Sequence, residues 1–273
     1  MFTDSDLQSL ARELASVPGV AGVALGGSRA RGTHRPDSDV DLGVYVRPDL
    51  DRAELSAVAT RWSDAETVIG EAGSWGLWVD SGAWLKVDGT SVDLILRDVQ
   101  RVTDQCRRAV RGQFAFHHQP GHPLGFLDIA YAGEVALCVP VADSSGLLRS
   151  LAQSLSPYPA ALRRSILHSL WQVDFLLDGA GKSVDLDDVG YVTLCTTHAV
   201  MLLAHGWHAA AGQWVVNEKG LIPAVSRLSI DTHDFSKRAA TLLGAIGATR
   251  AQMRQSIDQA RQLPRPDLER DAG

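Results

Sequence analysis

Two aspartates, Asp39 and Asp41, stand two positions apart at the start of an apolar run. Residues with this spacing on a strand point to the same face of a sheet. Two carboxylates on one face repel each other unless a cation lies between them, and Mg²⁺ prefers carboxylate oxygens together with substrate phosphates. The pair therefore indicates a divalent-metal clamp. The alternative is a solvated turn, because Pro-Asp-Ser-Asp is typical of turns.

The sequence Gly26-Gly27-Ser28, shortly before this pair, could bind phosphate. Glycines let backbone N–H groups approach a ligand closely, and a helix that begins at Ser28 would direct its first N–H groups at phosphate oxygens. Arg29 and Arg31 add positive charge nearby. Alone, the glycine pair would indicate only a tight strand-to-helix turn. Together with the aspartates it predicts transfer of a nucleotide from a metal-bound triphosphate.

Asp93 is the candidate for a third carboxylate. It lies in an apolar run that follows a predicted turn at Asp88-Gly89. A lone charge buried in such a strand is costly, so the alternatives are a functional site or an edge strand with its polar face in water. In the functional interpretation Asp93 completes the metal site, and it or another carboxylate deprotonates the attacking hydroxyl. Asp88 is assigned to the turn, and Asp98 is assigned to a helix cap.

The apolar pattern predicts the elements that position these residues. Strands are expected over 20–25 and 40–46, and residues 26–36 should form a loop with a first helical turn. A hairpin is expected over 83–96, after an irregular segment at 70–82. The other expected elements before residue 120 are helices over 4–17, 51–68 and 98–111 and a strand over 114–118.

Helical patterns dominate the rest of the chain, over 160–177, 189–211, 236–243 and 248–263. The expected fold class is therefore α+β: an α/β domain with a mixed sheet over residues 1–120 and a helical bundle over 121–273 that binds the substrate. Asp174 and Asp178 form an acidic pair on one predicted helix and would face either a cationic substrate or water.

The run Gly-Ser-Arg-Ala-Arg-Gly at 27–32, followed by Ser-Asp-Val-Asp-Leu at 38–42, resembles the nucleotidyltransferase superfamily with the DNA polymerase beta fold. Within that superfamily, the motif is most similar to those of the members that act on small molecules and of the minimal nucleotidyltransferases. The resemblance implies two Mg²⁺ ions, both held by Asp39 and Asp41 and one of them also by Asp93. It also implies that ATP or another NTP is the co-substrate. By the resemblance Ser28 would contact the triphosphate, and Gly27 and Arg31 are the further nucleotide-binding candidates that the residues themselves suggest.

Residues 191–219 resemble the C-terminal domain of aminoglycoside adenylyltransferases, in which a helix ends in a small-residue turn and a lysine follows. This likeness implies that Lys219 binds the nucleotide phosphates, with a solvated surface lysine as the alternative.

The function that the superfamily resemblance implies is Mg²⁺-dependent transfer of a nucleoside monophosphate, AMP from ATP in the first instance, to a hydroxyl of a small molecule. An aminoglycoside-like antibiotic is one candidate. The alternatives are an antitoxin-like enzyme that adenylylates a protein, a non-catalytic nucleotide-binding module and an RNA-end-extending polymerase.

The composition restricts the partners and the compartment. The net charge of −6 over 273 residues disfavours a nucleic-acid partner and is compatible with a cationic small-molecule acceptor. No apolar run is long enough to predict a membrane span. The three widely spaced cysteines form no disulfide framework, so a cytoplasmic location is expected. The oligomeric state is not indicated.

Overall fold

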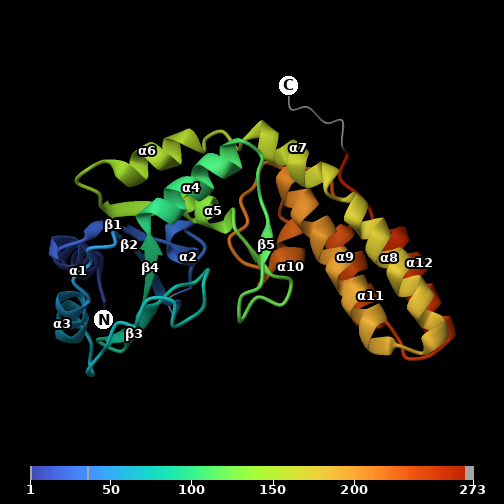
Figure 1. The fold of residues 1–273 in the computed structure, drawn as a ribbon, viewed down its shortest axis with the longest axis horizontal. Coiled ribbons are helices and arrows are strands. Elements are labelled where there is room, and N and C mark those ends of the chain that lie inside the picture. Colours follow the sequence, from blue (N-terminus) through green and yellow to red (C-terminus); the bar gives the residue numbers. More distant parts are fainter. Residues whose placement is uncertain (1, 36, 268–273) are drawn as a thin grey trace. The chain divides into compact units, whose positions relative to one another are not determined.

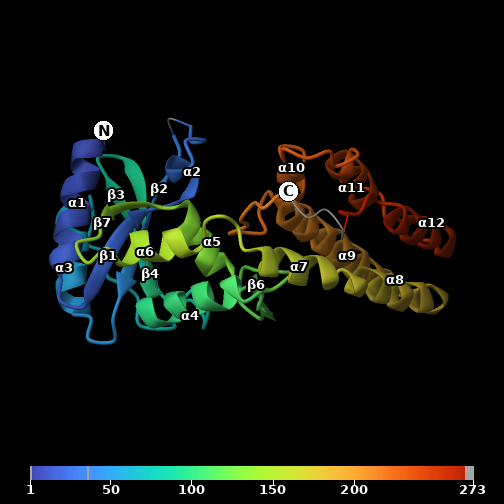
Figure 2. The same cartoon turned by 90° about the horizontal axis from the view of Figure 1, so that it is seen from above.

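The computed structural model describes residues 2–35 and 37–267, and the chain divides into two compact units (Figures 1 and 2). The first unit comprises residues up to 109 together with 114–156. The second comprises 110–113 and the residues from 157 onward. The boundary expected at residue 120 lies inside the first unit. Each unit is described below by itself.

A five-stranded sheet with the order β3-β4-β2-β1-β7 forms the centre of the first unit. The strands are β1 (Val20–Leu25), β2 (Val40–Val46), β3 (Gly82–Val87), β4 (Thr90–Asp98) and β7 (Val139–Ala142). β2 and β4 run parallel and the other neighbouring pairs are antiparallel, so the sheet is mixed as expected. The sequence pattern did not predict β7. This strand is short, contains Pro140 and lies at the edge, where a missing N–H group is tolerated.

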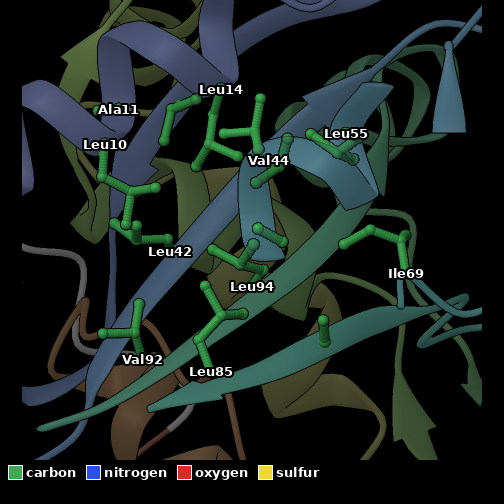
Figure 3. Close-up of a cluster of buried hydrophobic side chains, with 14 of the residues drawn as sticks. Leu10, Ala11, Leu14, Leu42, Val44, Leu55, Ile69, Leu85, Val92 and Leu94 are labelled. Atoms are coloured by element: carbon green, nitrogen blue, oxygen red, sulfur yellow. The ribbon is translucent and has the colours of Figure 1, made fainter. Parts of the chain in front are cut away.

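One face of the sheet packs against α1 (Asp4–Ser16) and α3 (Arg52–Trp62). Leu10 of α1 and Leu55 of α3 are fully buried in one apolar cluster with Leu42 of β2 and Leu94 of β4 (Figure 3). Side chains alternate along a strand, so residues 41, 43 and 45 and residues 93, 95 and 97 point to the opposite face. The core therefore fixes which face carries the two aspartates.

Helix α3 ends at Trp62, and the prediction that it continues to residue 68 was wrong. The chain turns back to the sheet edge there. Thr60 Oγ1 donates to the carbonyl oxygen of Thr67 at 2.9 Å and accepts from the Thr67 N–H at 3.1 Å. The N–H of Gly70 then donates to the carbonyl of Gly82 on β3. These long-range bonds override the helical pattern.

The remaining elements of the first unit follow the same chain order. They are α2 (Gly27–Ala30), α4 (Val99–Val110), β5 (Phe116–His117), β6 (Phe126–Leu127), α5 (Ala130–Leu137) and α6 (Leu147–Ser154). Figure 2 shows α5 on the side of the sheet opposite α1 and α3. α5 therefore lies on the face to which Asp41 and Asp93 point.

The second unit consists of helices, as expected. They are α7 (Ala160–His168), α8 (Trp171–Ser183), the 3₁₀ turn η1 (Val184–Leu186), α9 (Val189–Ala210), α10 (Leu221–Val225), α11 (Phe235–Leu243) and α12 (Arg250–Arg261). The single helix expected over 160–177 is interrupted at Ser169, whose hydroxyl donates to the Ile166 carbonyl at 2.7 Å. None of the helices in the described residues combines the length and the apolarity that a membrane crossing requires.

Candidate active site

Asp41 and Asp93 lie directly opposite each other on the parallel strands β2 and β4. Both point away from the apolar core, because their neighbours Leu42 and Leu94 point into it. Asp39 is exposed and precedes the first residue of β2, Val40, by one position. The structure therefore brings together Asp41 and Asp93, which lie 52 positions apart in the sequence. Asp39 lies directly before the start of β2, the strand that carries Asp41.

The three carboxylates interact electrostatically. Burial raises the pKa of Asp93 to about 6, and the charges of Asp41 and Asp39 add to this shift. Burial also raises the pKa of Asp41, with a further contribution from Asp39. Over residues 2–35 and 37–267, no three His, Cys, Asp or Glu side chains stand together closely enough to enclose a metal ion. Like charges repel each other, so the raised pKa values of Asp41 and Asp93 reflect their mutual repulsion as well as their burial.

The turn after β1 lies against Asp41. The N–H of Gly26 donates to the Asp41 carbonyl oxygen at 2.8 Å. Gly27 has φ +59°, and a Cβ placed on it would lie 1.7 Å from Asp41 Oδ2. Only a glycine at position 27 leaves room for this carboxylate, so the glycine pair and the aspartate form one local structure.

Helix α2 begins at Gly27 and places unpaired donors at the turn. The first helical bond runs from the Ala30 N–H to the Gly26 carbonyl at 3.1 Å. The N–H groups of Gly27 and Ser28 precede that bond and therefore have no acceptor within the helix. Together with the Ser28 hydroxyl they form a donor set suited to phosphate oxygens.

The two arginines of this segment differ in their contacts. Arg29 donates through Nη2 to the Ser38 carbonyl at 2.7 Å and through Nε to the Asp39 carbonyl at 3.2 Å. It therefore ties the loop before Asp39 to α2, a role that the sequence did not indicate. Arg31 is exposed, and its charge lowers the pKa of Asp41, which opposes the effect of burial.

A buried ion pair, Arg97 with Glu134, lies on the same side of the sheet. Arg97 on β4 is 5% exposed and makes two bonds of 2.7 Å to Glu134 on α5. Burial would lower the pKa of Arg97, but the charge and hydrogen bonds of Glu134 outweigh it and raise the pKa. Glu134 also contributes to the raised pKa of Asp41. The pair holds α5 against the strand that carries Asp93 and places a fourth carboxylate near the site.

Sequence reasoning missed this ion pair. The only signal was an arginine inside an apolar strand, and its partner lies 37 positions away on a helix that the pattern did not predict.

Lys219 belongs to the second unit and is exposed, and its backbone N–H donates to Asn217 Oδ1 at 2.8 Å. Its assignment to the nucleotide phosphates stays a prediction. Asp174 is paired with Arg265 at 2.7 Å, and Asp178 is paired with Arg261. These acids therefore stabilise the contact of α8 with the C-terminal residues of the unit.

Comparison with known proteins identifies the class of the first unit. A family model described as a nucleotidyltransferase domain matches residues 7–111, a range that includes Gly27, Ser28, Asp39, Asp41 and Asp93. This part of the chain is a nucleotidyltransferase domain, which confirms the resemblance of residues 27–42 to the nucleotidyltransferase superfamily.

Among solved structures, the chain is similar to a nucleotidyltransferase-like protein from Exiguobacterium sibiricum, with 14% identity and a TM-score of 0.47. The alignment covers 94% of this chain and 73% of that protein. No curated protein matches the sequence.

Proposed function

We propose that the chain transfers a nucleoside monophosphate, AMP from ATP in the first instance, to a hydroxyl of a small molecule. One observation carries the proposal. Asp41 and Asp93 lie opposite each other on parallel strands, and the Gly26–Ser28 turn lies directly against Asp41. Acidic oxygens and backbone donors thus lie side by side, and a metal-bound triphosphate requires both.

The carboxylates of Asp39, Asp41 and Asp93 would hold the divalent metal, for which we propose Mg²⁺. The donor set fits this ion, because carboxylate oxygens are hard ligands and the lack of a side chain at Gly27 lets the Asp41 carboxylate lie against the Gly26–Ser28 turn. A bound Mg²⁺ would neutralise triphosphate charge and make the acceptor hydroxyl more acidic.

The triphosphate would be bound by this chain's own donors. The N–H groups of Gly27 and Ser28 and the Ser28 hydroxyl would donate to phosphate oxygens, and the exposed Arg31 would add charge. By the resemblance of the second unit, Lys219 would contribute a further cation.

Asp93 would receive the acceptor's proton. β4 lies on the side of β2 away from β1, and β1 leads into the Gly26 turn. An acceptor that approaches from the β4 side would therefore meet Asp93 first. Its hydroxyl proton would pass to this carboxylate, its oxygen would form the bond to the α-phosphorus, and the bond to the β-phosphate oxygen would break, releasing pyrophosphate.

Pyrophosphate release tests the proposal directly. The full chain is incubated with Mg²⁺ and each NTP against aminoglycosides, lincosamides and acyclic polyols. We expect release with at least one acceptor, loss of release in Asp41→Asn, and normal release in Asp88→Asn, since Asp88 lies in the hairpin turn. Full activity in Asp41→Asn would overturn the proposal. ATP binding without release against any acceptor would favour a non-catalytic nucleotide-binding module.

A small helical protein that co-purifies with the chain would favour the antitoxin-like alternative. We further propose a cytoplasmic location, because Cys106, Cys138 and Cys195 are all free thiols.

A further inference from the structure

An exposed tryptophan lies beside Asp93. β3 and β4 are antiparallel, and Trp84 is the direct cross-strand partner of Asp93. Cross-strand partners have Cβ atoms about 5 Å apart on the same face of the sheet. The Trp84 side chain is 68% exposed, so burial in the core does not account for it.

A second tryptophan fixes the orientation of this ring. Trp75 stacks on Trp84 with ring centroids 4.3 Å apart and an angle of 20° between the planes. Gly82 precedes Trp84 by two positions, on the same strand face, and a Cβ there would lie 2.9 Å from Trp75 Cη2. The same Cβ would lie 2.0 Å from the Leu94 carbonyl oxygen, so the glycine makes room both for β4 and for Trp75 against β3.

The loop that carries Trp75 is held by a buried glutamine. Gln119, which is 3% exposed, donates through Nε2 to the Trp75 carbonyl at 2.6 Å and accepts at Oε1 from the Trp78 N–H at 3.0 Å. The N–H of Trp75 itself donates to the Asp80 carbonyl at 2.9 Å. Trp75 is thus held in place by the hydrogen bonds of its own backbone, and the stacked pair forms an ordered surface.

This surface lies on the acceptor side of the carboxylates. In the order β3-β4-β2-β1-β7, the phosphate-binding turn follows β1, which lies beyond β2, whereas Trp84 lies on the edge strand β3 on the other side of β4. We propose that the Trp75–Trp84 pair binds a ring of the acceptor, so that a hydroxyl on or beside that ring reaches Asp93. The inference rests on the proposed function and deepens it: the acceptor is a ring-bearing small molecule rather than an acyclic polyol.

The chemistry of an indole face supports this choice. It offers a flat apolar surface with a negative quadrupole, to which ring faces and cationic groups are attracted. An acyclic chain gains less, because it must also lose conformational freedom to lie flat.

The test compares Trp84→Ala with Trp171→Ala. Trp171 on α8 is 64% exposed and also has an aromatic partner, Phe175, so it controls for the loss of an exposed indole. With a ring-bearing acceptor from the release screen, we expect Trp84→Ala to raise the acceptor KM about tenfold or more and to leave the KM for ATP unchanged. Trp84→Phe should recover part of the loss, and Trp171→Ala should match the unaltered protein.

The outcomes separate this inference from the proposed function. An unchanged acceptor KM in Trp84→Ala, or a preference for sorbitol over ring-bearing compounds, would overturn the ring-binding surface while leaving nucleotidyl transfer intact. If no compound supports release, the proposed function fails. Calorimetric binding of kanamycin and lincomycin then decides the ring-binding surface: binding that is lost in Trp84→Ala supports it, and absent or unaltered binding overturns it.

Discussion

The Asp41 carboxylate occupies the space that a side chain on Gly27 would fill: a Cβ there would lie 1.7 Å from Asp41 Oδ2. The phosphate-binding turn and the central carboxylate are therefore sterically coupled. Because the Gly26 N–H also binds the Asp41 carbonyl, neither the turn nor the strand can shift without the other.

We predict that Gly27→Ala reduces pyrophosphate release by about a hundredfold, because a displacement of about 1 Å at a reacting centre has this effect. Gly32→Ala is the matched control. Gly32 also has a positive φ, +66°, but nothing lies within 4 Å of a Cβ placed there. Both variants incur the backbone strain of a left-handed alanine, about 1 kcal/mol. Equal activity in the two variants would show that the contact with Asp41 has no role.

Glu134→Gln should destabilise the first unit by about 3 kcal/mol, because it leaves the charge of the buried Arg97 unpaired. The measurement is the urea unfolding transition of the full chain. Glu13→Gln is the control, since Glu13 forms an exposed pair with Arg61 and should change stability by less than about 1 kcal/mol. A midpoint for Glu134→Gln equal to that of the control would contradict the structural role of the pair.

His205 makes the helical unit sensitive to acid. Burial on α9 lowers its pKa from 6.5 to about 3, with smaller contributions from His208 and His198. The unfolded chain therefore binds a proton at a higher pH than the folded chain. Stability is full above pH 6.5 and falls as the pH drops from 6.5 towards 3.

Between pH 7 and pH 5, protonation of His205 in the unfolded chain should lower the free energy of unfolding by about 2 kcal/mol, at about 1.4 kcal/mol for each pKa unit. Urea unfolding of the full chain, followed by helical circular dichroism at both pH values, measures the loss. His205→Phe should reduce the difference between the two pH values, and an unchanged difference would contradict the assignment.

Local patterns predicted much of the secondary structure around the candidate site. Strands at 20–25 and 40–46 are short apolar runs bounded by glycine or polar residues, so their ends could be read directly, and both match the structure. The turn at Asp88-Gly89 likewise fixed the hairpin that places Asp93. These features depend on neighbours in the sequence.

Features that depend on distant partners could not be predicted. The pairing of β7 with β1, the Arg97–Glu134 bonds and the Trp75–Trp84 stack each join segments whose contact depends on the folded sheet. The contacts of Arg29 could not be predicted for a related reason. Its donors bind the carbonyls of Ser38 and Asp39, which come close only when the loop before β2 is folded.

The central claim is that Asp39, Asp41 and Asp93 bind a divalent metal together with a nucleotide. Mn²⁺ binding to the full chain, followed by electron paramagnetic resonance with a non-hydrolysable ATP analogue, tests it most directly. The account predicts that the unaltered protein and Asp88→Asn bind Mn²⁺ equally well and that Asp41→Asn loses this binding. Binding by Asp41→Asn as tight as that of the unaltered protein would contradict it.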